Sequence, residues 1–391
     1  MYVSRHRQLM PAVVIALALG TVCLADTPAE RVGILWDRAI RQVDAGKLDD
    51  ALASAGKAVQ IAPGDSEAFR LMGWVFEQRH ECLGAEACYR KALELAPGRA
   101  LLHVARGRML DQPGGSKEAV VEYRKALNLN PDDAEACQSL AAELAAQGQV
   151  DQAVAAARAA VRLAPEAATS RAALGDSLRQ VGNADEAVAE LRKALQLDQA
   201  RIAEDHNDLG LALLEDGSVE EAIAELKEAV RLAGDPDTEA WFRNNLACAY
   251  TLAAQWPEAL DECGRARQVE PDQPWIEDTY GEALLLSGDS KRAEVVFRAA
   301  LRLEPAGPET SAGLALCLAQ EGQRPEAARL LTGIGADLGK PYAPIEVLYF
   351  AGKAYVALGE PARARELFAR AVQHWPKHPW AADMRTYLRG S

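Results

Sequence analysis

The chain has 391 residues, of which 49% are apolar, so it can bury a substantial core rather than remain disordered. Aromatic residues make up only 6%, and alanine is abundant, a composition that favours closely packed helices over a β-sandwich. The formal net charge of −14 offers no basic footprint, and we therefore expect no nucleic-acid partner.

The N-terminal segment has the pattern of an export signal. A basic start at Arg5 precedes an uncharged, mostly apolar stretch from Leu9 to Ala25, with small residues where a signal peptidase would cut, before Asp26. We expect residues 1–25 to be a cleaved signal peptide, and the protein to be exported to the periplasm or envelope. An uncleaved membrane anchor is the alternative, although the stretch is marginal for a spanning helix. A lipid attached to Cys23 would need flanking residues that are not present.

From residue 32 onward the sequence repeats about every 34 residues. The period is marked by a series of alanines that are 34 to 37 residues apart: Ala51, Ala85, Ala119, Ala153, Ala187, Ala222, Ala259, Ala293, Ala327 and Ala364. Twelve residues before each of these alanines the chain always has glycine or alanine, as at Gly73 and Gly281. Four residues after it, many repeats have a larger apolar residue, as at Tyr89 and Phe297.

Each period predicts two helices. Two apolar-periodic stretches of about a dozen residues are separated by a glycine-containing turn in seven repeats: Gly46, Gly148, Gly182, Gly217, Gly288, Gly322 and Gly359. A proline then ends the second helix in seven repeats: Pro63, Pro97, Pro131, Pro165, Pro271, Pro305 and Pro376. The small residue in the first helix leaves room for the second helix to approach closely. One such hairpin cannot bury its own apolar stripe, so we expect hairpins to be stable by stacking.

These residues, best seen together in Phe69, Gly73, Ala85, Tyr89 and Pro97, resemble the tetratricopeptide repeat family. The resemblance implies an all-α, right-handed solenoid of helix-turn-helix repeats that binds other proteins. We divide the chain into a signal peptide (1–25), a short linker (26–31), ten repeats and a capping helix (377–391). The repeats are 32–65, 66–99, 100–133, 134–167, 168–202, 203–239, 240–273, 274–307, 308–344 and 345–376. The loops around Arg201 and Pro236, and the segment 332–341, depart from the pattern and predict breaks or a shortened helix.

Candidate chemistry is sparse. The repeats leave no room for a catalytic domain, and the sequence has no phosphate-binding glycine loop, nucleophile elbow or His-Glu-x-x-His motif. We therefore expect neither an enzyme, a cofactor nor a metal site. The pair His374 and His378 has helical spacing for a metal, but Pro376 interrupts the helix between them. Cys248 and Cys263 lie at similar height in one predicted hairpin, where either a disulfide or two buried thiols would fit.

By resemblance to the family, the second, fifth, ninth, twelfth and thirteenth residues of each repeat line the inner groove. Acids outnumber bases at these positions, and tryptophans there serve either hairpin packing or partner binding. The predicted partner is therefore a polar-to-basic protein or peptide with some apolar anchors. The candidate groove residues are Trp74, Glu77, Arg108, Asp176, Asn207, Trp241, Asn244, Trp275, Asp278, Glu282, Tyr349 and Lys353.

The predicted function is an exported, non-catalytic scaffold or adaptor that assembles envelope or secretion complexes. The alternatives are a membrane-tethered regulator, and a non-catalytic subunit of a polysaccharide-export or other enzyme complex. Membrane contact is expected only if the N-terminal segment remains uncleaved.

Overall fold

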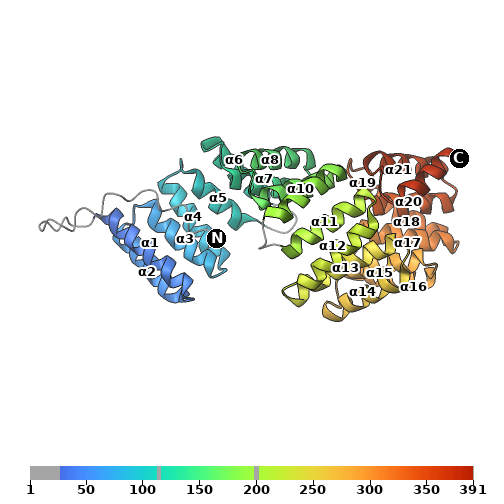
Figure 1. Cartoon of the computed structure of the whole chain (residues 1–391), viewed down its shortest axis with the longest axis horizontal. Coiled ribbons are helices and arrows are strands. Elements are labelled where there is room, and N and C mark those ends of the chain that lie inside the picture. The colour runs from blue at the N-terminus through green and yellow to red at the C-terminus, as the bar shows by residue number, and fades with distance from the viewer. Residues whose placement is uncertain (1–26, 112–115, 198–201, 391) are drawn as a thin grey trace, which may run out of the picture. The chain divides into compact units, whose positions relative to one another are not determined.

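The computed structural model describes residues 27–111, 116–197 and 202–390. The predicted signal peptide, Gln199 and Arg201 lie outside these described residues. Every regular element in the described part is a helix, and consecutive helices pack as pairs (Figure 1). The predicted all-α class, with stacked helical hairpins, is confirmed. None of the described helices is both long and apolar enough to cross a membrane.

The chain divides into two compact units, Met1–Leu110 and Asp111–Ser391. Unit 1 contains α1 (Pro28–Asp44), α2 (Leu48–Ile61), α3 (Ser66–Gln78), α4 (Cys82–Leu95) and α5 (Ala100–Leu110). Unit 2 begins with α6 (Lys117–Leu129), α7 (Ala134–Ala146), α8 (Val150–Leu163), α9 (Ala168–Gln180), α10 (Ala184–Leu197), α11 (Ile202–Asp216) and α12 (Val219–Leu232). It continues with α13 (Pro236–Leu252), α14 (Trp256–Val269), α15 (Pro274–Leu286), α16 (Ser290–Leu303), α17 (Pro308–Gln320), α18 (Arg324–Gly333), α19 (Gly335–Leu338), α20 (Ile345–Leu358), α21 (Pro361–His374) and α22 (Ala381–Gly390).

The turns and helix ends lie at the glycines and prolines predicted from the sequence. All seven predicted turn glycines have positive φ, between +69° and +94°, which closes the first helix in a left-handed conformation. His80 and Ala254 adopt the same conformation in turns that have no glycine there. The seven predicted prolines each lie two residues beyond the end of a second helix, where the missing N–H stops further helix formation.

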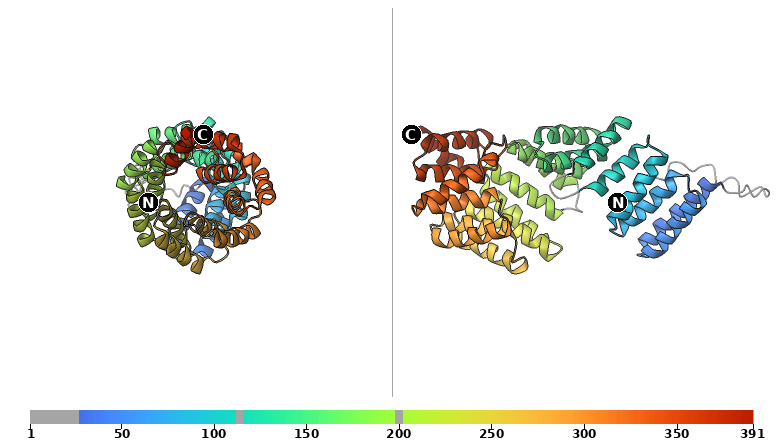
Figure 2. Two further views of the ribbon diagram at one scale, coloured as in Figure 1. Left: turned by 90° about the vertical axis from the view of Figure 1, so that its right-hand side faces the viewer. Right: turned by 180° about the vertical axis from the view of Figure 1, so that it is seen from behind.

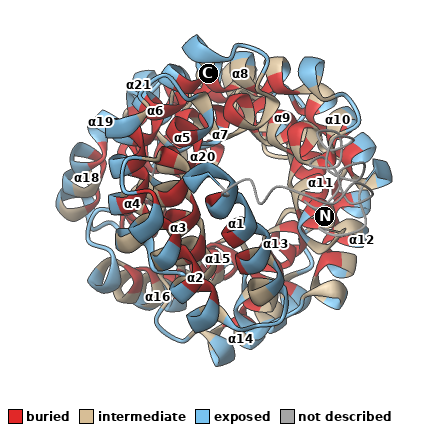
Figure 3. Ribbon diagram, turned by 90° about the vertical axis from the view of Figure 1, so that its left-hand side faces the viewer, coloured by how far each residue is buried: buried red, intermediate tan, exposed pale blue. Residues whose placement is uncertain are grey.

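Within a hairpin, a first-helix glycine faces a large side chain on the second helix. A Cβ built on Gly73 would lie 2.8 Å from the ring of Tyr89, and one on Gly281 would lie 2.6 Å from the ring of Phe297. The predicted close approach at this position is therefore present. Its partner is the large residue four positions after the marker alanine, which is itself buried. Figure 3 shows buried residues running along the packed helices, while the turns are mostly exposed.

Two departures from the repeat have clear structural consequences. α13 has 17 residues instead of the 13 of α15, because Asp235 caps its start and Pro236 fits the first helical turn. α18 has only 10 residues and is followed by the four-residue α19, so the predicted short second helix is confirmed. Cys248 and Cys263 are free thiols, which answers the question of a disulfide. Burial raises the pKa of Cys248 to about 12, so it is not a reactive thiolate.

The C-terminal helix α22 covers the last hairpin. Trp380 stacks on Tyr349 with ring centroids 4.5 Å apart, and Tyr387 meets the ring of Phe368 edge-on at 5.2 Å. Met384 is fully buried in the same cluster. The predicted capping helix is therefore present, and it shields aromatic side chains that α20 and α21 would otherwise expose.

Candidate interaction surface

The first helices of successive hairpins in unit 2 line a cavity of about 1040 Å³. They contribute Arg179 from α9, Glu215 from α11, Cys248 from α13 and Glu346 from α20. α9, α11 and α13 are the first helices of three consecutive hairpins, whereas α20 is the first helix of the last hairpin, further along the chain. The inner surface of unit 2, defined by these first-helix side chains, is the candidate site.

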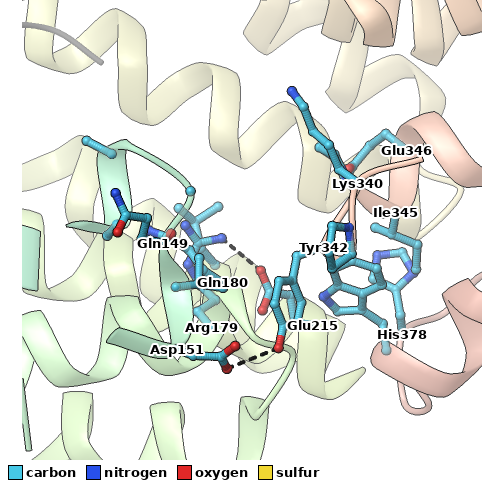
Figure 4. Close-up of a pocket in the computed structure, with 18 of the residues that line it drawn as sticks. Gln149, Asp151, Arg179, Gln180, Glu215, Lys340, Tyr342, Ile345, Glu346 and His378 are labelled. Atoms are coloured by element: carbon cyan, nitrogen blue, oxygen red, sulfur yellow. Dashed lines mark hydrogen bonds and ion pairs between the residues drawn. The ribbon is translucent and has the colours of Figure 1, made fainter. Parts of the chain in front are cut away.

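The far wall of the cavity comes from the C-terminal part of the same unit. The Tyr342 hydroxyl donates to Asp151 Oδ1 at 3.1 Å, and Trp375 and His378 also line the cavity (Figure 4). Lys377 forms ion pairs with Asp185 and with Asp216, the latter at 2.9 Å. Accordingly, α21 and the segment after it lie beside the α9–α11 region (Figure 2).

Glycine is required at two of these contacts. A Cβ on Gly182 would meet the backbone carbonyl of His374, and a Cβ on Gly217 would meet that of Lys377. These turn glycines therefore have two roles: their positive φ ends the first helix, and their missing side chain leaves space for the C-terminal segment. The approach encloses part of the inner surface between hairpins that are distant in sequence.

A partly buried ion pair lies on the cavity wall. Arg179 Nη1 is 2.7 Å from Glu215 Oε1, and the two side chains point toward each other from α9 and α11 (Figure 4). Burial opposes the charge on Arg179, but Glu215 and Asp176 outweigh it and raise the pKa of the guanidinium. Burial raises the pKa of Glu215 to about 7 despite the nearby Arg179.

Further carboxyl groups lie on the first helices α15 and α17, and Glu282 and Glu309 there interact electrostatically with Glu346 on the cavity wall, so we include them in the inner surface. Burial raises the pKa of Asp278 to about 7, and Glu309, Glu304 and Glu277 nearby act in the same direction. Burial also raises the pKa of Glu282, which is only 9% exposed. The pKa values of Glu309 and Glu346 are raised for the same reason. Such groups are costly to ionise without a positive partner, so a cationic ligand would favour their charged forms.

A second pocket of about 460 Å³ contains Trp241 and Trp275. The two indole rings meet edge-to-face with centroids 5.2 Å apart. Asn207 lies at its wall, with its Oδ1 accepting a hydrogen bond from Asn245 Nδ2 at 2.8 Å. Asn244 is 6% exposed, and its Oδ1 has no hydrogen-bond partner among the described residues.

Three of the candidate groove residues belong to unit 1. Trp74 packs against Trp36 with ring centroids 5.6 Å apart. Glu77 accepts a hydrogen bond from the Tyr89 hydroxyl at 2.8 Å and pairs with Arg108 at 3.1 Å. These residues therefore form contacts within their own unit, and they are not part of the inner surface of unit 2.

Other candidates in unit 2 have partners within the chain. Asp383 of α22 accepts from both Tyr349 and Lys353 at 3.0 Å, so these two positions belong to the contact with the capping helix. Asp176 pairs with Arg179 at 3.3 Å and helps to hold it. Sequence reasoning missed Tyr342, Trp375 and His378 at the cavity, because this part of the chain meets residues that lie about 190 positions away.

Comparisons with known proteins agree with this architecture. Tetratricopeptide repeat models match residues 139–202, 173–237, 284–343 and 345–388. The cellulose synthase operon protein C of Pseudomonas fluorescens (strain SBW25) is 29% identical over 150 residues, which are 35% of this chain and 11% of that protein. The chain thus matches only about a tenth of that relative's length.

Two solved structures are similar in fold. The crystal structure of the APC/C hetero-tetramer Cut9–Hcn1 aligns with a TM-score of 0.54 at 20% identity, covering 74% of this chain and 55% of that one. A tetratricopeptide repeat protein from Parabacteroides merdae aligns with a TM-score of 0.54 at 15% identity, covering 65% of this chain and 98% of that one.

Proposed function

Because the chain belongs to the tetratricopeptide repeat family, we propose that it is an exported, non-catalytic scaffold that binds other proteins through the inner surface of unit 2. The observation that carries this proposal is the cavity of about 1040 Å³, which is lined by side chains from successive first helices. An array of this kind presents a long surface on rigid elements, which suits the binding of a protein segment.

The charge of that surface indicates the chemistry of the partner. Glu282 is a buried carboxyl group, and Asp278, Glu309 and Glu346 are partly buried ones, so a positive partner would favour the ionisation of all four. We propose a partner that is polar to basic, with some apolar side chains. Complementary charges of this kind mainly accelerate association and select the partner.

The proposed location is the periplasm or envelope, on the basis of the apolar stretch from Leu9 to Ala25. A non-catalytic subunit of a polysaccharide-export complex is a second candidate, supported by the partial match to cellulose synthase operon protein C. N-terminal sequencing of the mature protein separates a cleaved, exported scaffold, which would begin at Asp26, from a membrane-tethered regulator that retains residues 1–25.

Site-specific photo-crosslinking in the native envelope tests the scaffold function. A benzoylphenylalanine at Gln180, which lines the cavity, should crosslink a partner protein. The matched control is the same residue at Val295, which is 67% exposed on α16, a second helix. Crosslinks from Gln180 and none from Val295 support the proposal. Crosslinks from Val295 alone, or from neither position, would rule out binding at the inner surface.

A further inference from the structure

The Trp241 pocket combines an exposed aromatic surface with four carboxylate side chains. It is lined by Trp241 and Trp275 together with Glu204, Asp208, Asp237 and Glu270, and the nine lining residues that belong to the described part of the chain include no Lys or Arg. Trp241 is 45% exposed, although it packs edge-to-face on Trp275. Part of a large apolar ring is therefore accessible within an acidic pocket.

The pocket arises where the repeat is interrupted. Asp235 Oδ1 accepts from Thr238 N at 2.9 Å and caps the start of α13, which is about one turn longer than the 13-residue α15. This first turn carries Asp237 to the pocket that also holds Trp241. The extra first turn of α13, which the sequence pattern predicted as a longer loop, thus supplies one of the carboxylates.

Unit 1 shows what such an aromatic pair binds in this same protein. There, the Arg70 guanidinium lies over the ring of Trp36 at 4.2 Å from its centroid, and Trp36 packs against Trp74. Glu67 holds the same guanidinium at 2.7 Å. A tryptophan pair, a stacked guanidinium and a carboxylate therefore form one arrangement within the described structure.

The chemistry of the Trp241 pocket fits the same group. The face of an indole ring attracts a cation, and the attraction grows when the cation is partly desolvated. A planar guanidinium can stack on the ring and still donate from its edge to carboxylates on several sides, which a lysine ammonium cannot do equally well. Glu204, Asp208, Asp237 and Glu270 line the pocket where these donors would lie.

We propose that the Trp241 pocket binds an arginine side chain presented by a basic segment of the partner. This inference rests on the proposed scaffold function and gives that function one specific contact. In unit 1 the chain supplies the arginine itself, whereas in unit 2 the partner supplies it. Asp237 and Glu270 provide the charge, and Trp241 provides the surface on which the guanidinium stacks.

The test uses the full mature chain and a defined probe. The probe is a fluorescein-labelled Gly-Ser peptide with three spaced arginines, and its matched control has citrulline, which keeps the shape but removes the charge. Fluorescence anisotropy in 50 mM salt should show the citrulline peptide binding at least about tenfold more weakly. Trp241→Leu, which keeps an apolar side chain at an exposed position, should weaken binding of the arginine peptide by about three- to tenfold.

Matched charge variants separate a specific pocket from general attraction. Asp237→Asn with Glu270→Gln should weaken binding of the arginine peptide several-fold. Glu220→Gln with Glu258→Gln changes the net charge equally at exposed positions on α12 and α14, and should change binding less than twofold. Melting temperatures of the variants establish that each is folded.

Any of the following results would overturn the assignment to arginine: equal binding of the citrulline peptide, no effect of Trp241→Leu, or equal weakening by both charge pairs. An equally tight lysine version of the peptide would also overturn it. Crosslinking at Gln180 keeps this result separate from the proposed function. A partner crosslinked there while the peptide ignores Trp241→Leu would remove this contact and leave the scaffold function intact. If no partner is crosslinked at Gln180 while Trp241→Leu weakens peptide binding, the arginine pocket is supported and the proposed scaffold function is not.

Discussion

Replacing Gly281 with leucine should lower the free energy of unfolding of unit 2 by about 3 kcal/mol or more, because the new side chain has no space. Even a Cβ at Gly281 would lie 2.6 Å from the ring of Phe297. That ring cannot move away easily, since a Cβ on Gly313, from the next hairpin, would meet it at the same distance of 2.6 Å. We expect a fall in melting temperature of roughly 5–10 °C in thermal melts followed by circular dichroism.

Two other glycines serve as controls for Gly281. Gly264, inside α14, has open space where a Cβ would stand, so Gly264→Leu should leave stability unchanged or raise it through better helix propensity. Gly288 also has open space, but its φ of +94° disfavours any other residue, so Gly288→Leu should cost only about 1–2 kcal/mol. An unchanged melting temperature for Gly281→Leu, or an equal loss for Gly264→Leu, would contradict this packing.

Removing Trp380 to Ser391 should make the protein aggregate and loosen its last hairpin first. The truncation deletes Trp380 from its stack on Tyr349 and Tyr387 from its contact with Phe368. It also removes the fully buried Met384, so a contiguous apolar face on α20 and α21 becomes exposed. Hydrogen exchange should show faster exchange in these two helices, and analytical ultracentrifugation should show oligomers.

A shorter truncation provides the control for the cap. Removing only the C-terminal residues from Arg389 onward keeps all the aromatic contacts of α22, and this variant should remain monomeric. If the longer truncation also stays monomeric, with unchanged exchange in α20 and α21, then α22 does not act as a cap.

The turns, the helix ends and the close contacts between paired helices could be predicted from the sequence, because the same residue types recur in each repeat. Turn glycines, prolines and small first-helix residues recur in fixed phase, and each has a local physical role. The partner of the small residue was less obvious. A glycine has a large residue sixteen positions later, as in Gly175 with Leu191 and Gly352 with Phe368, where a Cβ on the glycine would clash. The position of the marker alanine, such as Ala293, does not reveal which residue the glycine contacts, because this alanine is buried in every hairpin.

Long-range features could not be predicted in the same way. Nothing in a repeat indicates which hairpins meet further along the chain, so the pairing of Lys377 with Asp185 and Asp216 had no sequence signal. The division into two units between Leu110 and Asp111 lies inside the third predicted repeat, where the marker residues are regular. Counting acids by repeat position predicted an acidic groove, but burial alters the ionisation of those acids, and burial depends on tertiary structure.

If the inner acids of unit 2 attract a basic partner, as proposed, then the association rate must depend on pH. Burial raises the pKa of Asp278 to about 7, so this carboxyl is mostly protonated at about pH 5.5 and mostly charged at about pH 8.5. A basic partner, once identified by crosslinking, should therefore associate faster at the higher pH, and the gain should shrink as salt rises.

The deciding measurement is the association rate constant at these two pH values in 50 mM salt, for the wild type and for Asp278→Asn with Glu282→Gln. In the wild type the rate constant should be about two- to fivefold higher at the higher pH. The amide variant cannot gain charge at these positions, so it should lose most of this increase. Titration of the partner itself is common to both proteins and cancels in the comparison. Glu220→Gln with Glu258→Gln should keep the full increase. An increase that is the same in the inner variant as in the wild type, or one lost equally in the outer control, would contradict attraction by the inner acids.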